Sequence, residues 1–223
     1  MAIKKFDRKG YGQLEPSQVW FTRAGMSESQ CELDPEVFAA HFPMLPSETA
    51  TKRYAEVGQF LMIDKVNKIA TTPTEDLNEK GYMMGINYST EKLYSQFTPG
   101  RRNFCQICGE ALPRIGFVEP GMRICTNTVS WDSESDLFKN KIDPAGETSE
   151  SAQFYEIVKE TLADPTKDPI YAVVVEGSDG ELVVGADIAD ALGNVYAQVT
   201  EAYYNADNTL AFKIMFINKP VTT

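Results

Sequence analysis

VYAQVTEAYYNADNTLAFKIMFI, at residues 195–217, has the composition of two β-strands joined by a turn. Val, Ile, Tyr and Phe are enriched in strands because branched and aromatic side chains pack well on a pleated, half-buried surface. The polar residues 205–208 between the two apolar runs are typical of a hairpin turn. The stretch predicts strands over residues 195–204 and 210–217 and indicates a mainly β protein.

The residues before this hairpin predict two more strands and one helix. Residues 169–176 and 181–186 read as strands, with a turn signal at Ser178, Asp179 and Gly180. Apolar side chains recur at helical spacing over residues 149–163, and they are Phe154, Ile157, Val158 and Leu162. Thr148 or Ser149 can cap this helix, and Asp164-Pro165 ends it. Residues 146–223 are therefore predicted to form a C-terminal α+β module.

The central segment, residues 51–145, carries the signals of short strands separated by glycine and proline. The expected strands are residues 59–64, a short strand around Ile69, and residues 82–88, 114–118 and 122–129. The polar residues 72–80 are predicted to form a loop. Glycine and proline at this spacing favour small β-sandwich or barrel modules. With the one predicted helix, the expected fold class is mainly β, an α+β fold.

The first fifty residues differ from the rest. Aromatic residues such as Trp20 and Phe21 stand between glycine, proline and charged positions, and only residues 35–41 show a short helical possibility. We expect residues 1–50 to form an extended N-terminal arm. Since aromatic and Arg side chains tend to dominate interface energies, Trp20, Phe21 and Arg23 are candidates for contacts with a partner, although the same side chains could cover the protein's own core.

Composition and charge exclude several classes of protein. Among the 223 residues, 43% are hydrophobic and 24% charged, as in an ordinary globular protein. A net charge of −11 disfavours non-specific nucleic-acid binding, because that binding relies on Lys and Arg contacts to phosphates. No apolar run approaches the length of a membrane span, and no apolar segment follows the basic amino terminus as in a secretory signal. We therefore expect the chain to be made and used, or assembled, in a cytoplasm.

The four cysteines suggest reduced thiols with one possible metal motif. Cys105-Gln106-Ile107-Cys108-Gly109 is a CxxCG run of the kind found in zinc ribbons, and Cys125 follows at a spacing compatible with a second knuckle. The position three residues after Cys125 is Thr128, so Cys31 or His41 could complete a site only through the fold. The alternative is small buried thiols in strands. A redox role for the CxxC pair is disfavoured, because no helical pattern follows it.

No catalytic signature is present. The only histidine, His41, would have to serve any Ser-His or Cys-His arrangement, and its setting favours a helix end or surface role. No glycine-rich phosphate loop or GxSxG run occurs. We expect that the chain is not an enzyme and that it has no cofactor, zinc being the one alternative.

Two charged clusters complete the candidates. Asp132, Glu134 and Asp136 could contribute oxygen ligands to calcium, but the run lacks the glycine and distal glutamate of a known loop, so a solvated acidic loop is the better interpretation. Arg101 and Arg102 stand beside aromatic residues. They could stack on bases, but the overall negative charge favours docking against an acidic or apolar face of a neighbouring subunit.

Four stretches resemble tailed-bacteriophage virion structural proteins of the capsid-decorating or auxiliary head type. They are GQLEPSQVWFTRAG at residues 12–25, VGQFLMIDK at 57–65, TEKLYSQFTPGRRNF at 90–104 and LPRIGFVEPGMRICTNTV at 112–129. Together they cover about a quarter of the chain, and none is a catalytic motif. The resemblance implies a β fold, a structural role and multiple copies on a capsid.

The resemblance sets two further expectations, and two alternatives stay open. The partners would be the major capsid protein or other virion proteins, with multiple copies or a homo-oligomer, and no membrane. The chain would reside in the virion after assembly in the host cytoplasm. A tail, collar or head-fibre attachment component is the alternative within the same class, and a zinc-ribbon-like binding module that uses Cys105, Cys108 and Cys125 is the alternative outside it.

Overall fold

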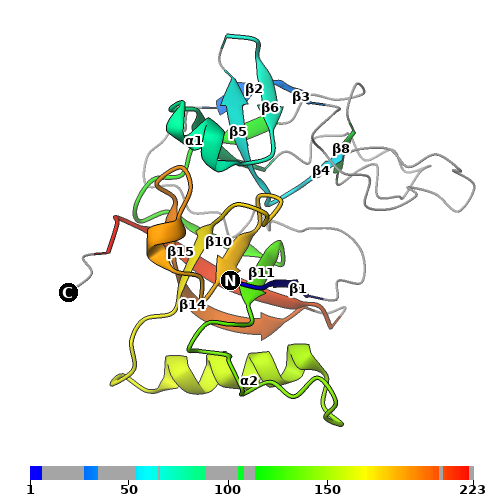
Figure 1. The fold of residues 1–223 in the computed structure, drawn as a ribbon, viewed down its shortest axis with the longest axis vertical. Coiled ribbons are helices and arrows are strands. Elements are labelled where there is room, and N and C mark those ends of the chain that lie inside the picture. The colour runs from blue at the N-terminus through cyan, green and yellow to red at the C-terminus, as the bar shows by residue number, and fades with distance from the viewer. Residues whose placement is uncertain are drawn as a thin grey trace, which may run out of the picture.

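A computed structural model describes residues 1–6, 28–34, 54–64, 66–88, 105–107, 114–205 and 208–220. Within these ranges the protein is mainly β, with a seven-stranded, a six-stranded and a two-stranded sheet. The one helix of more than five residues in the described ranges is α2, Glu150–Ala163. The predicted mainly β, α+β fold class is therefore confirmed. Figure 1 shows the six-stranded sheet at one end of the molecule and α2 at the other.

The seven-stranded sheet has the order β1-β11-β13-β12-β14-β15-β10. Its strands are β1 (Ile3–Lys5), β11 (Val129–Asp132), β13 (Leu182–Val184), β12 (Tyr171–Val174), β14 (Tyr196–Tyr204), β15 (Leu210–Ile217) and β10 (Arg123–Thr126). Only β11 and β13 run parallel among these pairs. The sheet takes strands from all three of the segments 1–50, 51–145 and 146–223 that the sequence analysis separates.

The predicted hairpin of β14 and β15 is confirmed and lies inside this sheet, between β12 and the edge strand β10. The two strands pair from Tyr196 with Ile217 to Tyr204 with Leu210, with an irregularity between Val199 and Glu201. Along β15 the pattern alternates beyond Phe212 between buried and half-buried residues, as a strand with one covered face requires. The strands predicted over residues 169–176 and 181–186 are confirmed as β12 and β13.

Helix α2 covers one face of the larger sheet (Figure 1). Ser149 caps its first turn by accepting a hydrogen bond from Ala152 N, and Asp164 stands at the C-cap, as the sequence predicts. Phe154 is fully buried beneath the helix. It belongs to a cluster of aromatic rings drawn from four parts of the chain, and these are Phe6, Trp131, Phe138, Phe154 and Phe212.

The six-stranded sheet has the order β2-β9-β7-β5-β6-β3. Its strands are β2 (Glu28–Gln30), β9 (Arg114–Gly116), β7 (Met83–Asn87), β5 (Phe60–Asp64), β6 (Ile69–Thr71) and β3 (Glu32–Leu33). A separate pair joins β4 (Tyr54–Glu56) to β8 (Cys105–Ile107). The strands expected over residues 59–64, around Ile69 and over residues 82–88 and 114–118 are thus present.

Strand β5 is buried on both faces because it separates two cores. Phe60 and Met62 belong to the large core beneath α2, whereas Leu61 and Ile63 belong to a second, smaller core with residues such as Cys31. Successive side chains of a strand point to opposite faces, so a strand between two cores must be apolar at every position. This placement accounts for the uninterrupted Phe-Leu-Met-Ile run.

Two local predictions are wrong. Residues 72–80, predicted as a loop, contain the short helix α1 (Glu75–Glu79), which Thr74 caps through its hydroxyl. The single strand predicted over residues 122–129 is divided into β10 and β11 at Asn127 and Thr128. Thr128 N donates to Thr126 Oγ1, a local side-chain bond that turns the backbone away from regular pairing.

The turn between β5 and β6 yields a pH prediction. Hydrogen bonds from Asn67, and then from Val66 and Tyr82, hold the pKa of Asp64 below its usual range. A carboxylate with a depressed folded-state pKa stabilises the fold above its unfolded pKa, and this contribution is lost as the pH falls through the folded pKa, below about 4.

We therefore expect the wild-type protein to lose more stability than Asp64→Ala between pH 7 and pH 3, as measured by urea unfolding. An NMR titration of the Asp64 carboxyl checks the cause directly. A titration midpoint at or above that of aspartate in an unstructured peptide would contradict the prediction.

Candidate functional site

The two large sheets meet at a junction held by hydrogen bonds between their backbones and side chains. Here the turn at residues 178–180 lies against the start of β5. Phe60 N donates to Gly180 O at 2.7 Å, and Gln59 Nε2 donates to Asp179 O at 3.0 Å. Gly180 has a φ of +81°, and a Cβ at this position would collide with the backbone of Phe60. Only glycine permits this close approach of two backbones.

A second set of buried hydrogen bonds holds residues 56–58, through Thr128 between β10 and β11 and through Asn87 at the end of β7. Thr128 Oγ1 donates to Val57 O at 2.7 Å, and Asn87 Nδ2 donates to Glu56 O at 2.9 Å. Gly58 N donates to Asn87 O at 2.7 Å. Buried polar groups that are hydrogen-bonded specify one geometry, because any shift would leave them unsatisfied. The junction therefore fixes the two sheets relative to each other.

Thr128→Val tests this junction. Valine keeps the shape of the fully buried Thr128 but removes the donor to Val57 O. We expect the free energy of unfolding to fall by about 1–3 kcal/mol, because a buried carbonyl loses its partner. The matched control is Thr200→Val, since the exposed Thr200 hydroxyl also donates to a carbonyl, that of Lys213. Urea unfolding of both variants measures the two losses in the free energy of unfolding. Equal losses would show that the buried hydrogen bond of Thr128 contributes no more than the exposed one of Thr200.

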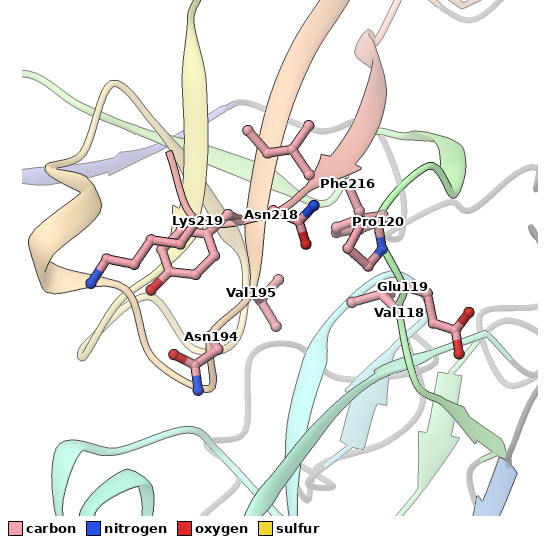
Figure 2. A pocket seen from close by; sticks show the side chains of 10 residues that line it. Val118, Glu119, Pro120, Asn194, Val195, Phe216, Asn218 and Lys219 are labelled. Carbon is pink, nitrogen blue, oxygen red and sulfur yellow. The ribbon is translucent and has the colours of Figure 1, made fainter. Parts of the chain in front are cut away.

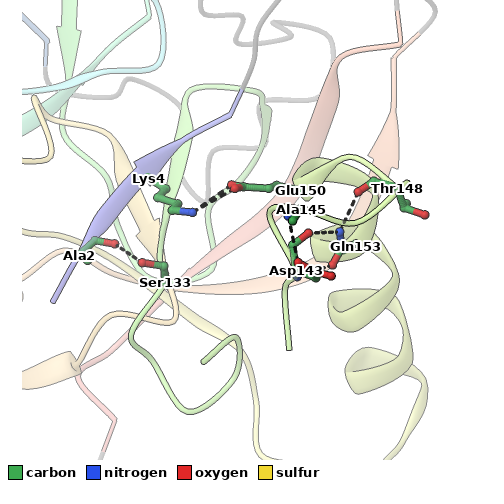
Figure 3. Close-up of polar contacts among 8 residues, drawn as sticks. All are labelled: Ala2, Lys4, Ser133, Asp143, Ala145, Thr148, Glu150 and Gln153. Carbon is green, nitrogen blue, oxygen red and sulfur yellow. Dashed lines mark hydrogen bonds and ion pairs between the residues drawn. The ribbon is translucent and has the colours of Figure 1, made fainter. Parts of the chain in front are cut away.

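The amino-terminal strand β1 is fastened at the edge of the larger sheet, beside β11 (Figure 3). Ala2 N donates to Asp132 Oδ1 at 2.8 Å, and Ala2 O accepts from both the N and the Oγ of Ser133. Lys4 Nζ lies 3.1 Å from Glu150 Oε2 on α2. These bonds attach β1 to β11 and to the helix, so residues 1–6 belong to the folded body.

The contacts of Asp132 correct part of the expectation for the acidic run. Glu134 and Asp136 are exposed, as predicted for a solvated loop, but Asp132 is buried and accepts from Ala2 N and Glu134 N. Its carboxylate therefore has a local structural role. In the described part of the chain, no group of three or more His, Cys, Asp or Glu side chains is placed to hold a metal ion.

The loop before α2 is fixed by one glutamine. Gln153 Nε2 donates to the carbonyl oxygens of Asp143 at 2.8 Å and Thr148 at 2.7 Å, and its Oε1 accepts from Asp143 N at 2.7 Å (Figure 3). Asp143 Oδ1 in turn accepts from Ala145 N at 2.9 Å. The exposed loop thus has a defined course before the helix begins.

A surface pocket of about 290 Å³ lies where three chain segments meet (Figure 2). The segments are residues 118–120, 194–196 and 216–219, which include the start of β14 and the end of β15. Val195 and Phe216 are buried at this place, whereas Glu119, Asn194 and Lys219 are exposed. Lys219 Nζ lies 5.9 Å from the ring centroid of Tyr196. The pocket thus combines an apolar floor with a polar rim.

The structure describes only some residues of the predicted cysteine site. Cys125 is 3% exposed in β10, and Cys31 is buried in the core of the smaller sheet. The backbone of Cys105 pairs with that of Glu56 in the two-stranded sheet. Cys108 and His41 lie outside the described residues, so zinc binding stays a hypothesis.

Metal analysis tests that hypothesis. On our interpretation that the thiols are buried in strands, the purified protein should contain no stoichiometric zinc, and a chelator should leave its melting temperature unchanged. Elemental analysis with thermal unfolding measures both. One zinc per chain, lost together with the fold on chelation, would favour the zinc-ribbon-like module instead.

The predicted partner-binding residues lie outside the described ranges, and they are Trp20, Phe21, Arg23, Arg101 and Arg102. Sequence reasoning missed the junction and the pocket. Gly180 was predicted as a turn residue, but its close contact with Phe60 has no local signal in the sequence. The pocket joins residues about 100 positions apart in the chain, which no spacing pattern reveals.

Comparisons of the chain with models of protein families, with curated proteins and with solved structures find no match. Among the described residues, no helix is long and apolar enough to cross a membrane. The residues and their geometry therefore carry the functional argument.

Proposed function

We propose that this chain is a non-enzymatic structural protein of a bacteriophage virion, which decorates or stabilises the capsid through contacts with the major capsid protein and with its own copies. The observation that carries the proposal is the buried junction at Gly180, Phe60 and Thr128, which fixes the two sheets as one body. A protein that gains affinity from several shallow contacts at once needs such fixed geometry, because the contacts act together only if their spacing is constant.

Two further features support the proposal. The amino-terminal strand is bonded to the larger sheet through Ala2 and Lys4, so an arm that follows it would start from a fixed point. The four stretches that resemble virion proteins include residues 57–65 and 112–129, which contain β5, β10 and the junction residues Val57 and Thr128. Two of the four stretches thus include residues of the junction.

Binding to assembled empty capsids tests this function. The purified chain is incubated with empty capsids of the phage that encodes it and is then sedimented. We expect the chain to sediment with these capsids and to raise their melting temperature, since a ligand that binds only the assembled form stabilises it. Capsids of an unrelated phage serve as the control.

A chain that remains in the supernatant with both kinds of capsid would overturn the decorating role. If the chain instead sediments with isolated tails or collars of the same phage, the function lies in the alternative attachment class.

A further inference from the structure

Residues 1–6 are held by a surface made of β11, the first turn of α2 and the turn at residues 178–180, which we call the strand site. We propose that the strand site also accepts residues 1–6 of a second copy, so that neighbouring copies of the chain exchange their amino-terminal strands. The inference rests on the proposed structural role, which places copies side by side, and it adds a defined surface and a defined occupant to that role.

Residues 1–6 contact the strand site as a separate peptide would. Among the described strands, β1 pairs with β11 alone and forms the edge of the sheet. Ile3 packs against the small core that includes Val173 and Val183, whereas Phe6 lies in the large core on the other face of the sheet. The strand is thus anchored on both faces by residues distant in the chain, in the manner of a peptide that adds a strand to the edge of a sheet.

Charge complementarity makes the fit specific. Lys4 Nζ lies 3.1 Å from Glu150 Oε2 (Figure 3), and it also lies 5.4 Å from the ring centroid of Trp131. Lys5 Nζ lies 2.7 Å from Asp179 Oδ2. The two consecutive lysines point to opposite faces of the sheet, and each meets a carboxylate. Adjacent lysines occur at only this one place in the sequence, so the same residues of another copy are the occupant that the chain itself can supply.

An empty strand site would be unfavourable. The ring centroid of Phe6 lies 4.7 Å from that of Phe154 and 5.7 Å from that of Phe212, so both rings would lose apolar cover without it. The buried Asp132 would lose the hydrogen bond from Ala2 N. A strand that leaves its own site is therefore best replaced by the same strand of another copy, which repeats every contact. Exchange of an identical element between copies costs little for this reason.

The length of the connecting segment permits the exchange. Residues 7–27 join Phe6 to β2, which begins at Glu28. At 3.3–3.6 Å per residue, a segment of this length can span up to roughly 70 Å. A compact chain of this size has a radius of gyration of about 17 Å. Residues 1–6 can therefore reach the strand site of an adjacent copy without any change in the rest of the fold.

Reciprocal charge changes test the exchange. In a chain with Lys4→Glu, and equally in a chain with Glu150→Lys, positions 4 and 150 carry like charges, so each strand fits its own site less well. When these two chains exchange strands, the substituted strand meets the substituted site and the wild-type strand meets the wild-type site. The two variants are co-expressed, one with a carboxyl-terminal tag, and heterodimers are counted by native mass spectrometry. We expect about tenfold more heterodimer than in the control mixture.

Lys80→Glu co-expressed with Glu150→Lys is the matched control. The two chains then carry the same net charges as in the test, but Lys80 pairs with Asp76 on α1, outside the strand site. Circular dichroism should show that all variants are folded. Heterodimer that exceeds the control supports the exchange, and heterodimer no more abundant than in the control overturns it.

A disulfide locates the contact within the heterodimer. Lys5 and Ser130 are direct partners in the β1–β11 register. With Lys5→Cys added to the Lys4→Glu chain and Ser130→Cys added to the Glu150→Lys chain, mild oxidation should link the two chains, and peptide mass spectrometry should find the bond between these positions. A single chain with both cysteine substitutions is the control for geometry. If that chain forms the bond internally but the heterodimer does not form it between chains, the contact lies elsewhere and the exchange is wrong.

Capsid sedimentation separates this inference from the proposed function. Chains that exchange strands but fail to bind capsids retain the inference and lose the decorating role. Chains that bind capsids but form no more heterodimer than the control retain the role and lose the inference.

Discussion

Gly180→Ala is expected to lower the free energy of unfolding by about 3–5 kcal/mol, which is large for the addition of one methyl group. A Cβ at this position would meet the carbonyl oxygen of Phe60 far inside van der Waals contact, and the φ of +81° adds backbone strain. The obstacle is backbone, which no side-chain rotation can relieve. Relaxation would have to separate the turn at residues 178–180 from β5 and break the hydrogen bond between Phe60 N and Gly180 O.

Gly81→Ala provides the matched control for this prediction. Gly81 also has a positive φ, +74°, but no atom lies within 4 Å of a Cβ built there. The substitution should therefore cost about 1 kcal/mol, the price of the backbone conformation alone. Urea unfolding of the two variants separates the cost of the positive φ, which both share, from the cost of the collision with Phe60, which only Gly180→Ala has. Similar losses in both would show that the two sheets are not held in close contact at Gly180.

Phe154→Ala is expected to lower the free energy of unfolding by about 3–5 kcal/mol. The ring of Phe154 is fully buried, and its centroid lies 4.5 Å from that of Phe138 and 4.7 Å from that of Phe6. Truncation removes a ring at the centre of the aromatic cluster and leaves a cavity between α2 and the larger sheet. Because Phe6 packs on this ring, the substitution should also loosen the amino-terminal strand.

Glu160→Ala is the control for Phe154→Ala, because it truncates an exposed side chain on the same helix. It should change the free energy of unfolding by less than about 0.5 kcal/mol. Hydrogen exchange of the backbone amides in β1 tests the second consequence. If Phe154→Ala leaves those amides as protected as in the wild type, Phe6 does not depend on the cluster.

The elements that the sequence predicts well are those whose pattern is local. The β14–β15 hairpin follows from two strand-forming runs with a polar turn between them, and α2 follows from helical spacing with a serine cap and an Asp-Pro end. These signals persist because tertiary packing agrees with them: α2 buries Phe154 and Val158, the same face that the spacing indicates.

Long-range contacts contribute to both wrong predictions, beside the local bonds at Thr74 and Thr126. Asn78 of α1 accepts a hydrogen bond from Gly193 N at 2.8 Å, so the short helix contacts a loop 115 residues away. The break between β10 and β11 lets β10 pair with β15 and β11 with β13. These contacts involve partners distant in the chain, which a window of neighbouring residues does not contain.

The residues of the candidate site likewise divide into those that the sequence indicates and those that only the fold brings together. Glu119 and Phe216 are ordinary surface and strand residues in the sequence, and only the fold brings them to one pocket. In contrast, Phe21 and Arg23 were identified from composition alone, because aromatic and arginine side chains in an arm are typical of contact residues.

The most direct test of the structural role is the number of chains bound per empty capsid at saturation, measured by quantitative mass spectrometry of sedimented capsids. The account predicts saturable binding with many copies per capsid, in a fixed ratio to the major capsid protein. Fewer than one chain per capsid, or binding that rises without saturation, would contradict it.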